Sequence, residues 1–381
     1  MLKRAIYILI TGFLAVSCEK SVRIADDKKI RLEVSDNLPF EDASTFVDTA
    51  NASVVVLGES EIPVEYVDKL REGNGYLYLF SRNEKAIFQF DSLGRNTNII
   101  RKVGHARNEY TDITDFDISN DSIFILDQNL QAVKIYSCDG KFIGNIDISK
   151  YWANFISVNG GYIYLFNNCS DCSAGKFRVF CLDVKGNLVA KHIPFTMDYG
   201  ISSDNVVCKQ DGYYLFCAMP DNSVYKVKND SVSLLAYLDF GNKEFPKEYH
   251  HLNLREILAK RLDESYVLGL DAIYSTGRYL VAKYRFAKET QYAIIDLETN
   301  AVVQRAQGFK VNGAYKMGLS AFHVDNGYVY NIYSAETFIS IYDNVLNKEV
   351  FADKYKAELK HIRETIEPLD NPVVVVEYKL K

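Results

Sequence analysis

Short apolar strands separated by glycine-bearing turns recur through most of the chain. An apolar strand, a gap of four to six residues, a second apolar strand and a glycine turn form the unit, and two neighbouring copies are offset by 46 positions. A repeat of this length in a strand-rich sequence predicts β-propeller blades, because one four-stranded unit cannot bury its own face and must stack on a neighbour. The aligned positions are Tyr78-Leu79-Phe80 with Phe124-Ile125-Leu126, Ala86-Ile87 with Ala132-Val133, Phe90 with Tyr136, and Gly94 with Gly140.

Six segments of one style can be counted, each following a turn that contains Gly, Asn or Asp and each about ten residues after a shorter strand. We therefore predict an all-β, six-bladed propeller over residues 38–381. In each blade the first strand should line the central channel, the next two should form the core and the fourth should form the rim. The segments are Gly75-Tyr76-Leu77-Tyr78, Ser122-Ile123-Phe124-Ile125, Gly161-Tyr162-Ile163-Tyr164, Gly212-Tyr213-Tyr214-Leu215, Gly277-Arg278-Tyr279-Leu280 and Gly327-Tyr328-Val329-Tyr330.

Three segments interrupt this rhythm. Apolar residues at near-helical spacing predict an inserted helix over about 245–264 and a C-terminal helix over Lys354–Ile366. The final segment, Pro372–Leu380, contains four consecutive valines that must be paired. Because a propeller closes when a terminal strand completes the sheet begun at the other end, we expect either Pro372–Leu380 or Val54–Leu57 to close the ring.

The first residues have a different character. Lys3 and Arg4 precede an apolar run that is too short to span a bilayer, which predicts a signal peptide over residues 1–17. Small residues lead up to Cys18, as in a bacterial lipobox, so Cys18 is expected to carry the lipid after cleavage. Residues 18–37 are polar and charged and are interpreted as a tether.

Composition narrows the classes of partner. The chain of 381 residues has 48% hydrophobic residues, enough for a large single core. Loss of Lys3 and Arg4 leaves 42 basic against 50 acidic residues, a formal charge of −8. This balance disfavours nucleic acid and anionic lipid surfaces as partners. We expect a monomer in the cell envelope, attached by its lipid to the outer membrane on the periplasmic side or at the cell surface.

Four passages resemble the six-bladed propeller lipoproteins of the Bacteroides group, relatives of NHL-repeat propellers. The resemblance covers nearly the whole chain and departs at His105-Ala106-Arg107-Asn108, where that family usually has a Gly/Pro-rich loop. It implies the propeller fold and binding at the surface or in the periplasm, and it supplies no catalytic residues. The passages are the lipobox at Cys18, Val103-Gly104 through Asn108-Glu109-Tyr110, Leu238-Asp239-Phe240-Gly241 with Phe245-Pro246, and Asn371-Pro372-Val373-Val374.

Cysteine chemistry has one candidate site. Cys169 and Cys172 stand in a Cys-x-x-Cys arrangement on a connection about six residues longer than its counterparts. A disulfide or two free thiols, half of a zinc site, and a redox pair are the alternatives, since an exported protein is open to disulfides. No second Cys-x-x-Cys is present to complete a zinc site, and the motif lies between strands rather than at a helix N-terminus.

The expected innermost strands offer a second candidate. Several carboxylates that converge on one axis could hold a divalent cation or form an acid and base pair. The alternative is that these acids cap turns and accept hydrogen bonds from backbone amides. The candidate residues are Asp68, Asp115, Asp117, Asp204, Asp271 and His323.

Three functional hypotheses follow. The first is a membrane-anchored binding or scaffolding lipoprotein that presents one face of the propeller to a protein or glycan and needs no cofactor. The second is a propeller enzyme of the lyase, lactonase or dehydrogenase kind that uses the channel carboxylates, with or without a divalent cation. The third is a structural component of the envelope. No phosphate-binding loop, nucleophile elbow or His-Glu-x-x-His motif occurs in the sequence, which favours the first hypothesis.

Overall fold

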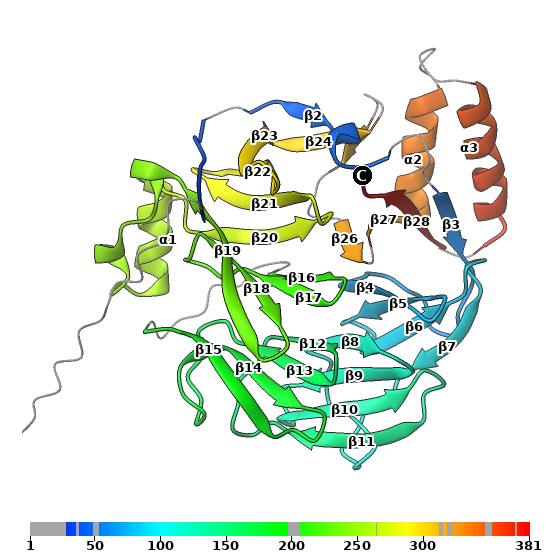
Figure 1. The fold of residues 1–381 in the computed structure, drawn as a ribbon. Helices are drawn as coiled ribbons and strands as arrows, with labels where there is room; N and C mark the ends of the chain where they lie inside the picture. The colour runs from blue at the N-terminus through cyan, green and yellow to red at the C-terminus, as the bar shows by residue number, and fades with distance from the viewer. Residues whose placement is uncertain are drawn as a thin grey trace, which may run out of the picture.

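Six antiparallel sheets are arranged as blades around a common centre in the computed structural model of the chain (Figure 1), so the predicted fold is confirmed. The structure describes residues 28–35, 38–48, 53–196, 206–263, 265–311, 315–317, 322–325, 327–346, 353–369 and 372–381. Among these residues, no helix has the length and apolarity needed to cross a membrane. From the innermost strand outward, blade 1 is β4 (Lys69–Gly73), β5 (Tyr76–Ser81), β6 (Ala86–Phe90) and β7 (Asn96–Ile100); blade 2 is β8 (Asp115–Ser119), β9 (Ser122–Asp127), β10 (Ala132–Ser137) and β11 (Phe142–Asp147); blade 3 is β12 (Phe155–Asn159), β13 (Tyr162–Phe166), β14 (Phe177–Asp183) and β15 (Leu188–Pro194); blade 4 is β16 (Val207–Gln210), β17 (Tyr213–Phe216), β18 (Ser223–Lys228) and β19 (Ser231–Asp239); blade 5 is β20 (Leu270–Ser275), β21 (Tyr279–Phe286), β22 (Glu289–Asp296) and β23 (Ala301–Ala306); blade 6 is β26 (Phe322–Asp325), β27 (Tyr328–Ser334), β28 (Val373–Lys379) and β3 (Ser53–Leu57).

The second and third strands of each blade supply most of the core. In blade 1 every residue of β6 is buried, whereas β7 at the rim is buried only at Ile100. Apolar side chains of adjacent blades pack together between the sheets, as Phe80 of β5 does edge-on against Phe116 of β8. This stacking explains why the apolar pattern repeats along the sequence, because each sheet buries its faces only against its neighbours.

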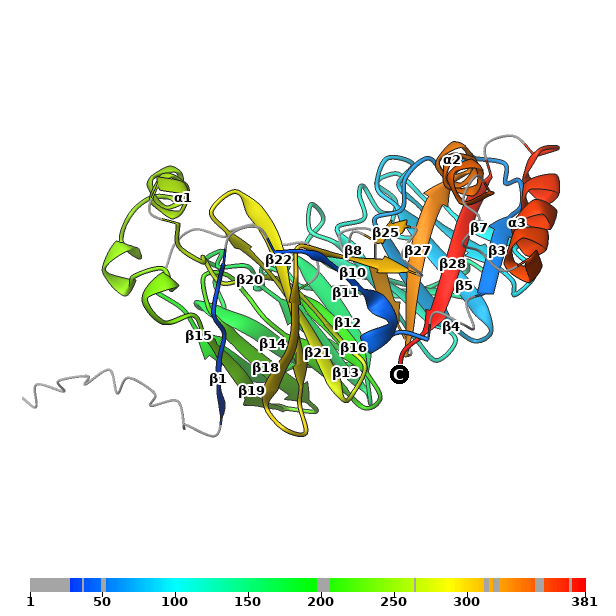
Figure 2. The same ribbon diagram turned by 90° about the horizontal axis from the view of Figure 1, so that it is seen from above.

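The two faces of the disc differ. Connections from the first to the second strand and from the third to the fourth strand are short, and several need a left-handed backbone, as at Asn74 (φ 54°) and Gly75 (φ 78°). We call their side the turn face. The remaining connections emerge on the opposite side, the loop face, and carry the three α-helices, α1 (Leu254–Asp263), α2 (Ala335–Leu346) and α3 (Asp353–Ile366). Figure 2 shows α1 and α2 on the same side of the disc.

Two of the helices match the sequence prediction and one was missed. Within the expected insertion at 245–264, α1 begins only at Leu254, after the 3₁₀ turns η4 (Gly241–Lys243) and η5 (Lys247–Tyr249). Asn253 and Glu256 cap its start reciprocally, with each side chain accepting from the other's backbone N–H. The C-terminal helix α3 spans the expected residues, whereas the preceding helix, α2, was not predicted.

Both candidate strands take part in closing the ring. The C-terminal strand β28 pairs with β27 on one side and with the N-terminal strand β3 on the other, so Val373 lies between Ser334 and Leu57. Its four valines are buried. Blade 6 is therefore built from both ends of the chain, and the sheet has no unpaired apolar edge at β28.

The tether expected over residues 18–37 is wrong for its described part. Strand β1 (Lys29–Arg31) pairs in parallel with β19 at the outer edge of blade 4, and Ile30 and Leu32 are buried in the core there. Arg31 also forms an ion pair with Asp239, at 3.0 Å between Nη1 and Oδ1. This segment is part of the folded body, because burying two aliphatic side chains offsets the cost of ordering a short strand.

The same segment continues around the rim. The carbonyl oxygen of Ser35 accepts a hydrogen bond from Gln291 of blade 5, and β2 (Phe40–Asp42) pairs in parallel with β24 (Gly308–Val311). After η2 (Ala43–Thr45), a bridge between Val47 and Leu380 leads to blade 6. β24 in turn pairs with β25 (Tyr315–Met317). We call residues 28–35 and 38–48 the strap, since they link blades 4, 5 and 6.

Candidate functional site

The centre of the disc is filled by charged side chains that pair between blades. Lys69 and Arg71 lie on β4 of blade 1, and Asp115 and Asp117 lie on β8 of blade 2. The Nζ atom of Lys69 is 2.7 Å from Oδ1 of Asp115, and Nε of Arg71 is 3.1 Å from Oδ1 of Asp117. Each pair joins positions that are 46 residues apart, which is the offset of the sequence repeat.

Two further blades join this network. Lys209 of β16 places Nζ 3.7 Å from Oδ1 of Asp117, and Asp325 of β26 places Oδ1 3.9 Å from Nη1 of Arg71. Side chains from blades 1, 2, 4 and 6 therefore meet at the centre. The carboxylates that were candidates for binding a cation are next to cationic side chains of the protein itself.

The carboxylates also accept hydrogen bonds from the backbone of the neighbouring blade. Asp115 and Asp117 accept from the N–H groups of Ile156 and Val158 on β12, at 2.9 and 2.8 Å. Asp325 accepts from the N–H of Glu72 on β4 at 2.7 Å. A charge-assisted hydrogen bond to a buried amide is stronger than a neutral one, so these contacts hold inner strands of adjacent blades together. Among the alternatives, the geometry supports the amide-satisfying role for Asp115 and Asp117.

Electrostatics separates the two central carboxylates. Burial alone would raise the pKa of Asp117, but Lys209, Arg71 and Lys69 outweigh it and hold that pKa below its ordinary value. At Asp325 burial wins over the attraction of Arg71 and raises the pKa. Asp117 is therefore the permanently charged centre of the network, while Asp325 is the more easily protonated member.

His323, on β26, has no basic character at neutral pH. Burial, followed by repulsion from Arg71 and Lys69, lowers the pKa of His323 to about 4. The imidazole is neutral near pH 7, so it could not serve as a proton donor that is half charged at that pH.

The other candidate residues lie apart from this network. Asp68, just before β4, accepts from the backbone N–H of Arg82 at 2.7 Å, and Asp271 on β20 pairs with Nε of Arg285 at 2.6 Å. Asp204 lies outside the described residues. Among the described residues, no group of three or more His, Cys, Asp and Glu side chains is placed to hold a metal ion.

Sequence reasoning missed the basic half of the centre. The structure brings in Lys69, Arg71 and Lys209, as well as Asp325, none of which was a candidate. A signal was present, because the 46-residue offset aligns Lys69 with Asp115 and Arg71 with Asp117. Opposite charges at equivalent positions of successive inner strands indicate ion pairs between blades rather than a converging set of acids.

The Cys-x-x-Cys connection joins β13 to β14 on the loop face. Both cysteines are free thiols in the structure. Cys169 is buried, with a left-handed backbone (φ 62°), and burial raises the pKa of its thiol. Cys172 is partly exposed and donates to the carbonyl oxygen of Gly175 at 3.3 Å. A thiol with a raised pKa is a poor nucleophile at neutral pH, so Cys169 is unsuited to redox exchange.

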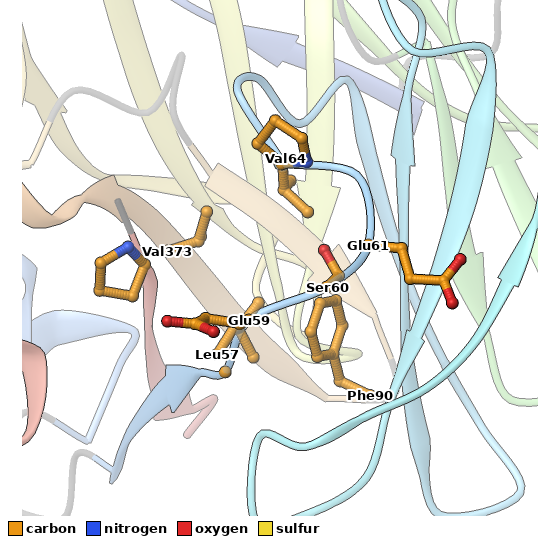
Figure 3. A pocket seen from close by; sticks show the side chains of 10 residues that line it. Leu57, Glu59, Ser60, Glu61, Val64, Phe90 and Val373 are labelled. Carbon is orange, nitrogen blue, oxygen red and sulfur yellow. The ribbon is translucent and has the colours of Figure 1, made fainter. Parts of the chain in front are cut away.

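A cavity of about 460 Å³ opens at the seam where β3 meets blade 1 (Figure 3). The connection from β3 to β4 forms most of its wall, and the start of β28 forms the rest. Figure 3 shows Glu59 and Glu61 pointing in different directions along this connection. The size is within the range of small-molecule and side-chain pockets. We call it the seam cavity; it is lined by Leu57, Gly58, Glu59, Ser60, Glu61, Pro63, Val64, Phe90, Pro372 and Val373.

Comparison with known proteins identifies the fold and a family. The sequence profile described as "Domain of unknown function (DUF4934)" matches residues 62–377. The chain is similar to the crystal structure of a "Putative exported protein" from Bacteroides fragilis, with a TM-score of 0.69 and 16% identity over 93% of this chain and 99% of that one. A member of the DUF4221 family from Bacteroides vulgatus aligns with a TM-score of 0.49 and 12% identity over 86% of this chain and 97% of that one. No curated protein matches. At these identities the structural likeness shows the fold alone, and it supports the propeller part of the resemblance noted in the sequence.

Proposed function

We propose, for a chain that belongs to the DUF4934 family of domains of unknown function, the role of an envelope binding protein that presents its loop face to a protein or glycan. The seam cavity is the observation that carries this proposal. It is walled mainly by two loop-face segments, residues 58–64 and 372–373, and is large enough for a side chain or a sugar unit.

The charged centre supports binding rather than catalysis. Lys69 and Arg71 neutralise Asp115 and Asp117, and the same carboxylates already accept backbone hydrogen bonds. A catalytic carboxylate needs an open position for substrate, whereas these are committed to contacts between blades. We therefore do not carry the lyase, lactonase or dehydrogenase hypothesis further.

We also propose that Cys18 is acylated and attaches the protein to the outer membrane. The support is the lipobox ending at Cys18, which lies outside the described residues, together with the exported description of the Bacteroides fragilis neighbour. Several acyl chains on one residue give stable attachment, since each buried methylene contributes about 0.8 kcal/mol.

The binding role is tested by blocking the seam cavity. Glu59→Trp places a large side chain at an exposed position of the cavity wall, and Lys141→Trp places the same side chain at an exposed turn of the opposite face. Purified variants are compared in pull-downs from solubilised envelope and on a glycan array. The proposal predicts that Glu59→Trp loses the partner bound by the native protein while Lys141→Trp keeps it. Equal binding by both variants, with unchanged melting temperatures, would contradict it.

A further inference from the structure

The start of the strap and a group of exposed apolar side chains lie on the same part of the disc. From them we infer a membrane-facing surface: the edge of the turn face formed by blades 3 and 4 rests on the lipid bilayer, and the loop face points away from it. This inference rests on the proposed anchoring through Cys18 and adds which side of the disc meets the lipid.

The direction of the strap gives the first argument. β1 runs parallel to β19, with Lys29 opposite Tyr237 and Arg31 opposite Asp239, and β19 then leads through η4 to α1 on the loop face. Figure 2 shows the N-terminal end of β1 on the side of the disc opposite α1 and α2. The chain before Lys28 therefore joins the folded body from the turn-face side of blade 4.

The length of chain before the strap gives the second argument. Cys18 precedes Lys28 by ten positions, and ten residues span at most about 36 Å. A strand that crosses the disc, such as the eight-residue β21, measures about 26 Å. Passing α1 on the loop face would need roughly another 10 Å, the diameter of a helix. A lipid on Cys18 could thus bring the loop face to the bilayer only with the linker fully extended, whereas the turn face is within easy reach.

Exposed side chains beside the strap give the third argument. Val184, in the turn before β15, is 53% exposed, and Leu188 and Val189 at the start of β15 are 42% and 44% exposed. β15 contacts β19, the strand on which β1 lies. Exposed Lys185 and Lys228 occupy neighbouring turns of the same face.

This combination suits a lipid surface. Aliphatic side chains can enter the boundary between headgroups and acyl chains, while long lysine side chains keep their ammonium groups in water. The net negative charge of the chain weakens attraction to anionic lipid, so this surface depends on the anchor to hold it at the bilayer. The patch of Val184, Leu188 and Val189 is the part of the surface that we expect to touch the lipid.

The single tryptophan allows a direct test. Trp152 lies on the connection between β11 and β12 on the loop face and is 36% exposed. A second form of the protein carries Leu188→Trp with Trp152→Phe and so reports from the turn face. Both are purified as full-length acylated protein and reconstituted in vesicles of phosphatidylethanolamine and phosphatidylglycerol that contain a lipid brominated near its headgroup. Fluorescence is then compared with vesicles free of bromine.

We expect bromine to quench most of the emission of the Leu188→Trp form and to leave Trp152 unquenched. Quenching of Trp152, or equal emission of the Leu188→Trp form with and without bromine, would overturn the orientation while leaving the anchor intact, provided that the protein sediments with the vesicles. If the native full-length protein does not sediment with vesicles, the anchor itself fails, and the orientation fails with it. A Cys18→Ala form that stays in the supernatant shows that attachment depends on the lipid.

Discussion

At the scale of single residues, the centre of this propeller holds pairs of opposite charge contributed by neighbouring blades. Arg71 contacts both Asp117 and Asp325, so it links blade 1 to the blades on either side. Asp117 keeps its charge because Lys209, Arg71 and Lys69 hold its pKa below the ordinary value despite burial. Removing one member of such a set leaves a buried charge without a partner, which costs more than the pair itself contributes.

We predict that Arg71→Met destabilises the protein by about 3–5 kcal/mol, because Asp117 and Asp325 lose a shared cation in a buried site. Urea unfolding followed by circular dichroism measures the change. Arg278→Met is the matched control, since its ion pair with Asp296 is at the surface and should be worth at most about 1 kcal/mol. Similar losses for the two variants would show that the central network does not carry stability.

A second residue-scale prediction concerns pH. The pKa of His323 is about 4 in the folded protein, against an ordinary value of 6.5, so only the unfolded chain takes up this proton between those values. Stability that is present above pH 6.5 should fall as the pH drops to 4, by roughly 3 kcal/mol in total from this group. Asp325, whose pKa is raised, acts in the opposite direction, so the readout is the difference between native protein and His323→Gln. Identical pH profiles of melting temperature would refute the assignment.

At the scale of elements, the 46-residue repeat was sufficient to predict the blades. The segments Tyr76–Ser81 and Ser122–Asp127 are equivalent strands, β5 and β9, as the alignment required. The strap was missed although Ile30, Leu32 and Val34 alternate with charged residues, the pattern of a strand with one buried side. Three strand residues are too few for that period to stand out within a polar segment.

Helix α2 was missed for a different reason. It follows β27 without a break, and Ile339 and Ile341 are β-branched residues that favour strands. The packing of α2 against β27 overrides that local preference. One cue was available, since the Ser334 hydroxyl accepts from the backbone N–H of Thr337 and so caps the helix start.

The ring closure yields an element-scale prediction. Deleting residues 372–381 removes β28, whose buried valines lie between β27 and β3, and leaves two unpaired edges. Unpaired edges expose backbone and apolar side chains to other chains, so the truncated protein should lose its cooperative melting transition and aggregate. Scanning calorimetry and light scattering test this. A truncated monomer that melts cooperatively near the native temperature would mean that β28 does not close the ring.

At the scale of the whole molecule, short turns occupy one face and all three helices, the Cys169 connection and the wall of the seam cavity occupy the other. The repeat predicted the number of blades but could not locate this cavity. It is formed by residues 58–64 and 372–373, which are distant in sequence and meet only when the ring closes. Sites that depend on closure therefore have no local sequence signature.

Anchoring is predicted to depend on one residue. Cys18→Ala should move the protein from the membrane fraction to the soluble fraction, because the apolar run before Cys18 is too short to hold it in a bilayer. Cell fractionation followed by immunoblotting checks this, with the native protein as the control. Retention of Cys18→Ala in the membrane pellet after a carbonate wash would place the anchor elsewhere.

Photo-crosslinking in intact cells tests the central claim, that the loop face binds the partner. A photoreactive phenylalanine is placed at Glu59, in the wall of the seam cavity, and separately at Lys141, an exposed turn on the opposite face. The account predicts that illumination joins a protein or glycan to the Glu59 position and not to the Lys141 position. Crosslinks that form only from Lys141, or equally from both positions, would contradict it.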